Sequence, residues 1–166
     1  MNNELLLVTI KEEYCNYLRK FDKKVPYNYG NKSNRPFIGV LFEVNLCKYF
    51  APLSSPKEKH LKMKNKLDFL KLDNGKLGAV NFNNMIPVND NNITKINLDK
   101  IVSNKNDIKY QKLLKEQIYW LNRNKEKLYK RSTNLYNKYL NNNLDKNIYK
   151  RCCNFKLLEL KCKEYN

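Results

Sequence analysis

The sequence predicts an α+β fold: a small antiparallel sheet, curled into a barrel, followed by a layer of helices. Short apolar runs separated by turn signals fill the chain up to about residue 98, as is typical of strands. From Asp107 the apolar residues recur every three to four positions, the period of amphipathic helices. We therefore expect one domain over residues 1–166, with a β-rich core at about 5–100 and a helical layer at about 107–166.

The first strand is expected at residues 5–10, an apolar and β-prone run. Thr9 and Glu12 have the spacing of a capping box, so a short amphipathic helix should follow as far as Phe21. Residues 22–34 are polar and rich in Asn, which predicts a long loop. Loops of that length inside a compact domain are often functional.

Two hairpins should form the centre of the sheet. Residues 37–44 are apolar enough for a strand buried on both faces, and a tight turn should join them to a strand at 47–53. The turn sequence Asp-Asn-Gly at 73–75 predicts a second hairpin between residues 67–72 and 76–82. Shorter strands are expected at 85–88 and 93–98.

Two helical faces follow the sheet. The first is marked by Tyr110, Leu113, Leu114, Ile118 and Leu121, and the second by Leu128, Leu135, Tyr136, Tyr139 and Leu140. Residues 155–160 form a last apolar patch, which fits a strand or a helix.

The charge balance favours an anionic partner. Lys and Arg total 33 against 16 Asp and Glu, so the formal net charge is +17. Since 42% of the residues are hydrophobic, the chain is not a disordered polycation. Nucleic acid or an anionic surface is the partner that such an excess indicates. Part of the charge can also reflect AT-rich codons, because Lys, Asn, Ile and Tyr are all abundant.

The five cysteines form no CxxC pair and no zinc pattern with histidine, so we expect no metal site and no cofactor. An odd number of cysteines without a signal peptide predicts a reducing, cytoplasmic location. No apolar run approaches the length of a membrane span.

The most informative stretch for function is residues 51–57, with the sequence Ala-Pro-Leu-Ser-Ser-Pro-Lys, followed by His60. Ser54 and Ser55 lie beside Lys57 at the end of an expected strand, where hydroxyls and a cation can bind a phosphate. The histidine can move protons at such a group. The alternative is a purely structural role: Ser-Ser-Pro forms an ordinary turn, in which the serines form hydrogen bonds to their own backbone, and the histidine is a solvated surface residue.

Blocks of sequence in a fixed order resemble the ToxN/AbiQ family of type III toxin–antitoxin endoribonucleases. Residues 51–57 are the most specific block, and Lys48-Tyr49-Phe50 precedes them. The others are Tyr17-Leu18-Arg19-Lys20-Phe21-Asp22 with Val25-Pro26, Pro36-Phe37-Ile38-Gly39-Val40, Leu77-Gly78-Ala79-Val80-Asn81 with Met85-Ile86-Pro87-Val88, and Cys153-Asn154-Phe155-Lys156-Leu157-Leu158-Glu159.

This resemblance implies a compact, twisted antiparallel barrel, SH3-like and similar to the MazF/Kid toxins, with added helices. It implies metal-independent, sequence-selective RNA cleavage that leaves a 2′,3′-cyclic phosphate and a 5′-hydroxyl. It also implies inhibition by a small repeated pseudoknot RNA, ring-like toxin–RNA assemblies, and an output of growth arrest or abortive phage infection, with cellular or phage mRNA as the substrate.

The resemblance also assigns site residues. The family's serine falls on Ser55, its neighbouring hydroxyl on Ser54 and its lysine on Lys57, while the basic residue ahead of the second strand is Arg35. We expect Arg35 and Lys57 to stabilise charge on the phosphate and Ser55 to orient the reacting groups. His60 matches a histidine in some relatives and is the candidate acid or base.

RNA binding has two further candidate regions. The expected loop interleaves aromatic and basic residues, namely Tyr27, Tyr29, Lys32 and Arg35, and unpaired bases stack on aromatics while cations follow the backbone. These aromatics can instead pack onto the barrel. The expected helices carry a second basic cluster, made of Lys125, Lys127, Lys130 and Arg131, which is either an RNA contact or a solvated helix face.

Two functions remain open on the residues themselves: an endoribonuclease toxin, or a non-catalytic RNA-binding protein on the same barrel. Both functions predict RNA binding that weakens with salt. Replacing Ser55 by alanine distinguishes them, because a toxin should lose RNA cleavage and toxicity while it keeps RNA binding. A membrane-surface protein is disfavoured, because no basic amphipathic anchor is evident.

Overall fold

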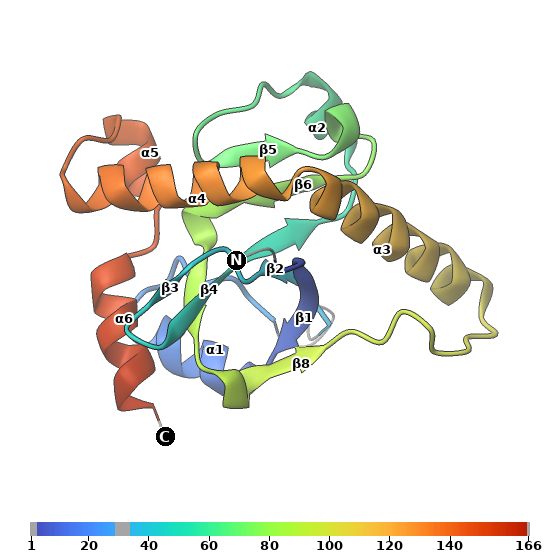
Figure 1. Cartoon of the computed structure of the whole chain (residues 1–166), viewed down its shortest axis with the longest axis horizontal. Helices are drawn as coiled ribbons and strands as arrows, with labels where there is room; N and C mark the ends of the chain where they lie inside the picture. The colour runs from blue at the N-terminus through green and yellow to red at the C-terminus, as the bar shows by residue number, and fades with distance from the viewer. Residues whose placement is uncertain (1–2, 29–33, 166) are drawn as a thin grey trace.

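A computed structural model of the chain describes residues 3–28 and 34–165 and has an α+β architecture (Figure 1). Its strands are β1 (Leu6–Ile10), β2 (Phe37–Gly39), β3 (Glu43–Val44), β4 (Cys47–Ser54), β5 (Phe69–Lys71), β6 (Ala79–Asn81), β7 (Ile86–Val88) and β8 (Ile93–Lys95). Its helices are α1 (Glu12–Arg19), α2 (Glu58–Lys62), α3 (Lys105–Arg123), α4 (Lys125–Leu140), α5 (Lys146–Arg151) and α6 (Phe155–Glu164). Most of the helical residues therefore follow the sheet, as expected.

Strand β4 is the centre of the sheet. The antiparallel path runs β5-β6-β4-β2-β1-β8, and β3 and β7 also pair with β4. β4 is eight residues long, so it pairs with β3 and β7 through its first half and with β2 and β6 through its second half. No pairing between described residues joins the end strands β5 and β8, so the sheet is open where a closed barrel was expected.

The N-terminal elements follow the prediction with two corrections. The expected capping box at Thr9 and Glu12 is wrong: α1 begins after Lys11, and no side chain caps it. The expected strand at 37–44 is two strands, because the register against β4 shifts by two residues between them: Ile38 pairs with Ala51, whereas Glu43 pairs with Lys48. At Gly39 the β4 residue Phe50 packs so closely that an added Cβ would lie 2.6 Å from its ring.

Both predicted hairpins form. β3 and β4 are joined through Asn45 and Leu46, whose φ angles of 50° and 68° give the left-handed backbone of a tight hairpin turn. β5 and β6 pair across a short 3₁₀ turn at Asp73–Gly75. Residues 155–160, which fitted a strand or a helix, are helical and belong to α6.

Helices α4 and α6 are tied to the central strand through one carboxylate. The hydroxyls of Tyr49 on β4 and Tyr136 on α4 both donate to Oε1 of Glu159 on α6, each at 2.6 Å. Figure 1 shows α4 lying across the sheet and α6 beside it, while α3 extends away from the body of the molecule.

The five cysteines are all free and buried, which agrees with a role as small core residues. Within residues 3–28 and 34–165, no helix is long and apolar enough to cross a membrane.

Candidate functional site

Two strand ends meet at one corner of the sheet because β2 and β4 are antiparallel. The Leu53 N–H donates to the Pro36 carbonyl at 3.0 Å, at the edge of this pairing. One residue further out, Arg35 lies across from Ser54. The pairing therefore brings the cation that precedes β2 to the serines that end β4.

A hollow of about 380 Å³ opens at this corner, and we call it the serine hollow. Arg35, Ser54, Ser55 and Lys57 all line it, and Tyr110 of α3 contributes the wall from a distant part of the chain. Asn34, Pro36 and Leu53 complete the lining. The hollow thus brings together all the predicted catalytic residues except His60.

Strand β6 and the loop before it hold the serines in place. Ser54 pairs with Ala79, and its Oγ accepts a long hydrogen bond from Asn81 Nδ2 at 3.4 Å. Gly78 has a φ of +99°, and a Cβ added there would lie 1.9 Å from the Ser54 carbonyl oxygen. Only a glycine permits so close an approach of the two backbones. Ser55, one residue further, is exposed.

The two cations of the hollow differ in their surroundings. Arg35 is half-buried, and burial lowers the pKa of its guanidinium from the ordinary 12.5, although arginine keeps its charge at neutral pH. Lys57 is exposed. None of the three ion pairs among the described residues includes either side chain, so no described carboxylate neutralises them. Both charges are available to an anion in the hollow.

His60 lies outside the serine hollow. It is buried, with 3% of its surface exposed, and its ring packs against Phe69 at a centroid distance of 5.9 Å. Its ring Nδ1 accepts the backbone N–H of Lys57 at 3.2 Å, while the backbone N–H of His60 donates to the Lys57 carbonyl at 2.9 Å. Burial, and then Lys59 and Lys57, lower the pKa of His60 below 6.5. This arrangement fixes the start of α2 and the backbone of Lys57.

The predicted loop contacts are only partly described. Tyr29 and Lys32 lie outside the described residues. Tyr27 is 49% exposed, and the Arg19 guanidinium lies over its ring at 5.1 Å from the centroid. Tyr27 does not line the serine hollow.

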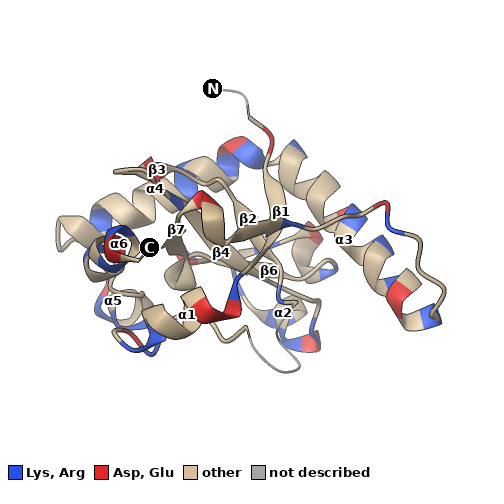
Figure 2. Ribbon diagram, turned by 90° about the horizontal axis from the view of Figure 1, so that it is seen from below, with Lys and Arg blue, Asp and Glu red and all other residues tan. Residues whose placement is uncertain are grey.

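The basic cluster on α4 is also separate from the serine hollow. Lys130 is exposed and Lys125 is partly exposed, whereas an Arg131 N–H donates to the Lys66 carbonyl. Figure 2 shows basic residues on several helices, including α3 and α4, so α4 is one part of a wider basic surface. Its role in RNA binding stays a prediction.

One residue that lines the hollow and one residue that contacts its lining were not recognised from the sequence as part of the site. Tyr110 was assigned to the apolar face of a helix, but it is 39% exposed and forms a wall of the hollow. Asn81 was quoted only as part of a sequence block, yet it donates to Ser54. Tyr110 could have been found from the sequence, because it lies between Lys109 and Lys112, and an aromatic residue between cations is typical of nucleic-acid contacts.

The described residues contain no group of three or more His, Cys, Asp and Glu side chains that could hold a metal ion. The polar groups that converge at the site are hydroxyls, an amide and cations.

The fold and the hollow together define a class: a small, strongly basic α+β protein with a site suited to a phosphate group. Comparison with known proteins gives the family. The chain belongs to the family "Toxin ToxN, type III toxin-antitoxin system", which matches residues 6–163.

Relatives match along nearly the whole chain. Endoribonuclease ToxN of Bacillus thuringiensis subsp. kurstaki is 31% identical, over 95% of this chain and 82% of that protein. Endoribonuclease ToxN of Pectobacterium atrosepticum is 33% identical, over 95% and 91%. Endoribonuclease AbiQ of Lactococcus lactis subsp. lactis is 32% identical, over 98% and 90%.

Solved structures agree with this assignment. The structure of AbiQ, described as a lactococcal anti-phage endoribonuclease of the type III toxin–antitoxin system, matches with a TM-score of 0.84 at 32% identity over 98% of both chains. A second structure, described with selective toxin inhibition by a non-coding RNA pseudoknot, matches with a TM-score of 0.82 at 31% identity, again over 98% of both chains.

Proposed function

We propose that this chain is the endoribonuclease toxin of a type III toxin–antitoxin system and that the serine hollow is its active site. The observation that carries the proposal is the meeting of Arg35 with Ser54, Ser55 and Lys57 around one hollow, in a chain of the ToxN family. The three relatives named above are all endoribonucleases.

The proposed reaction is attack of an RNA 2′-hydroxyl on the adjacent phosphorus. A new bond forms between the 2′-oxygen and phosphorus while the bond from phosphorus to the 5′-oxygen breaks. The 2′-hydroxyl loses its proton, and the leaving 5′-oxygen takes up a proton. The products are a 2′,3′-cyclic phosphate and a 5′-hydroxyl, and no metal ion takes part. Such a reaction requires donors aimed at the phosphate oxygens, where negative charge develops.

The residues of the hollow divide these tasks. Arg35 presents a planar fork that binds two phosphate oxygens, and Lys57 adds a compact positive charge. Ser55, which is exposed at the hollow, orients the 2′-hydroxyl and the phosphate, because an unactivated serine is a poor base at neutral pH. The Ser54 hydroxyl accepts a hydrogen bond from Asn81 and can donate one to the phosphate. His60 positions Lys57 rather than exchanging protons with the substrate, since it lies outside the hollow.

We further infer that residues 1–166 act as one toxin domain and that its curled, open sheet is related to the SH3-like barrel of the MazF/Kid toxins. The central position of β4, which pairs with four other strands, supports a single cooperative unit.

The inhibitor that we propose is a small repeated RNA, folded as a pseudoknot, that closes with the toxin into a cyclic assembly in the cytoplasm. One support is the non-coding RNA pseudoknot named with the second solved structure. Another is the net charge of +17, which favours a structured RNA partner. A short tandem repeat followed by a terminator in the DNA upstream of the reading frame would support this partner.

The decisive experiment compares wild-type protein with Ser55→Ala on cellular RNA in the presence of EDTA. Wild type should cut, and the new 5′ ends should accept a label from polynucleotide kinase without prior dephosphorylation. Ser55→Ala should lose cleavage and toxicity but retain binding of the inhibitor RNA. Ser103→Ala, at an exposed position away from the hollow, is the matched control and should cut like wild type.

Each failure has a distinct meaning. A wild-type protein that binds RNA but cuts none would favour the non-catalytic RNA-binding alternative. Cleavage that disappears with EDTA would contradict the metal-independent mechanism, and 5′-phosphate ends would contradict attack by the 2′-hydroxyl.

A further inference from the structure

A second hollow of about 400 Å³ adjoins the serine hollow. It lies between α3 and the segment of residues 96–102 that follows β8, and we call it the α3 hollow. Asn34 and Tyr110 line both hollows. A molecule that occupies one hollow can therefore extend past these shared side chains into the other.

The walls of the α3 hollow are mostly apolar. Ile96, Leu98 and Val102 line it from the segment, and the buried Leu114 lines it from α3. The polar side chains of the lining are Thr9, Asn34, Asn97, Lys100, Asp107 and Gln111. Apolar walls with a few polar groups are typical of sites that take a flat, largely apolar ring with hydrogen-bonding edges.

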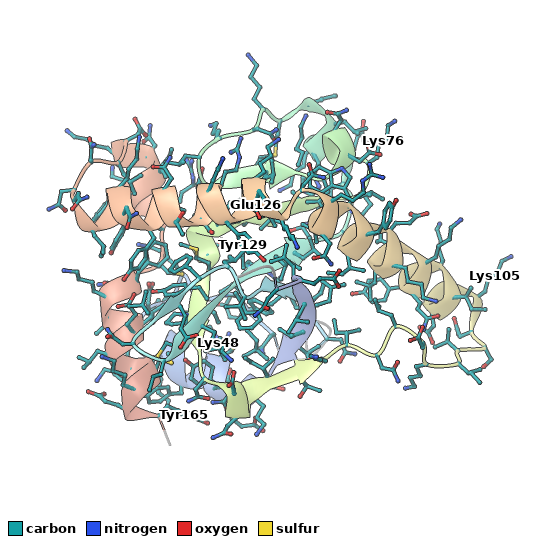
Figure 3. The ribbon with its side chains drawn as sticks, in the orientation of Figure 1. Lys48, Lys76, Lys105, Glu126, Tyr129 and Tyr165 are labelled. Carbon is teal, nitrogen blue, oxygen red and sulfur yellow. The ribbon has the colours of Figure 1, made fainter. Side chains whose placement is uncertain are left out.

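Hydrogen bonds hold this hollow together. Gln111 Nε2 donates to the Lys100 carbonyl at 2.7 Å, which ties the segment to α3. Asn97 Oδ1 accepts the Asp99 N–H at 3.0 Å. Asn104 caps α3 by accepting the N–H groups of Asn106 and Asp107. The N-terminal half of α3, which begins at Lys105 as labelled in Figure 3, is therefore held against the preceding segment by the hydrogen bond from Gln111.

The charge of the α3 hollow differs from that of the serine hollow. The α3 hollow is lined by one cation, Lys100, and one carboxylate, Asp107, whereas the serine hollow is lined by two cations and no carboxylate. None of the described ion pairs includes Asp107. A carboxylate repels a phosphate but accepts hydrogen bonds from the N–H groups of a nucleobase. The α3 hollow is thus suited to a base, whereas the serine hollow is suited to a phosphate.

We propose that the α3 hollow binds the unpaired base of a nucleotide adjoining the scissile phosphate, with Tyr110 as the wall between base and phosphate. Asp107 and Gln111 read the edge of this base, so the α3 hollow sets part of the sequence preference of cleavage. The proposal rests on the proposed function, because it needs the reacting phosphate to occupy the serine hollow. Unpaired bases are commonly read in this way, by a stacking aromatic and by hydrogen bonds to their edges.

The test is the cleavage profile on an RNA library randomised around one cut site. Asp107→Asn replaces an acceptor with an amide, so it should change the preferred base at one position within two nucleotides of the cut. The ratio of cleavage rates between the best and the worst base there should fall roughly tenfold to a hundredfold. Val102→Trp, which fills the hollow from the segment, should weaken the same preference.

Glu116→Gln is the matched control. Glu116 lies on the same helix and the substitution removes the same charge, but this residue lines a third hollow, which shares only Tyr110 with the α3 hollow. Its profile should equal that of wild type, and circular dichroism should show all three variants folded.

The outcomes separate the two proposals. If wild type cuts with a base preference that neither Asp107→Asn nor Val102→Trp alters, the base site is wrong and the proposed function stands. If Glu116→Gln shifts the preference as much as Asp107→Asn does, general charge explains the effect and the base site is again wrong. If wild type does not cut, the proposed function fails and the base site fails with it.

Discussion

The only histidine of the chain lies close to the site in sequence, but its side chain lies outside the serine hollow. Because the pKa of His60 is lower in the folded chain than its ordinary 6.5, the unfolded chain binds the proton more tightly. The contribution of neutral His60 to the free energy of unfolding should therefore be fully present above pH 6.5 and be lost as the pH falls below that value. Urea denaturation at a series of pH values between 7.5 and 5 would measure this loss.

His60→Gln is the informative variant for this prediction. Its side chain can still accept the Lys57 N–H, but it does not titrate. The loss of stability below pH 6.5 should be smaller in the variant than in wild type, and cleavage at pH 7.5 should persist. A His60→Gln protein that is folded but inactive would show that the histidine takes part in the reaction.

Arg35 is the second residue whose chemistry can be tested alone. Removing one preorganised donor from the transition-state oxyanion typically costs about 10²–10³-fold in rate, so Arg35→Ala should lose that much. Arg35→Lys keeps the charge but loses the planar fork, so its cleavage rate should lie between that of wild type and that of Arg35→Ala. Single-turnover cleavage of one oligonucleotide measures all three. Equal rates for Arg35→Lys and Arg35→Ala would indicate that geometry, not charge, decides.

Among the elements, the loop between β5 and β6 connects the stability of the sheet to the position of the serines. Gly78→Ala should strain the left-handed backbone by about 1–2 kcal/mol and push the new Cβ against the Ser54 carbonyl. We expect a lower unfolding midpoint and a loss of cleavage that exceeds what the unfolded fraction explains. Thermal denaturation and cleavage measured at 20 °C separate the two effects.

Gly75→Ala is the control for this loop. Gly75 also has a positive φ, +95°, but an added Cβ would meet the His60 carbonyl at 2.9 Å rather than the serine strand. This variant should lose stability while the folded protein keeps more of its cleavage. Equal losses of cleavage at equal stability would contradict a specific effect of Gly78 on the serines.

At the scale of the whole molecule, the excess of positive charge predicts two kinds of RNA contact with different salt dependence. The slope of log affinity against log salt falls by about 0.7 to 0.9 for each phosphate contact that is lost, from single strands to duplexes. Lys130→Ala on α4 should reduce the slope for the structured inhibitor RNA and leave that for a short single-stranded substrate unchanged. Fluorescence anisotropy at four salt concentrations measures both, and a change for the short substrate would extend the substrate site to α4.

Local sequence signals predicted most of the elements but fewer of the contacts. The Asp-Asn-Gly turn and the helical periodicity from Asp107 identified β5, β6, α3 and α4, because these signals depend on neighbours in the chain. The open sheet depends on how β4 pairs with distant strands, and the split of residues 37–44 depends on a shift of register against β4; no hydrophobic pattern records either. Ser55 and Lys57 were found from the residues of one short stretch and Arg35 through the resemblance, whereas the wall of the hollow at Tyr110 depends on where α3 lies relative to the sheet.

Tyr110 is far in sequence from the other residues that line the serine hollow, which has a consequence during synthesis of the chain. Residues 34–57 supply every other lining group of the serine hollow, and they leave the ribosome well before residue 110 does. If the serine hollow is the active site, as we propose, it lacks this wall until α3 has been translated. We therefore expect cleavage only from chains that extend past Tyr110, and the inhibitor RNA can be present before such a chain is complete.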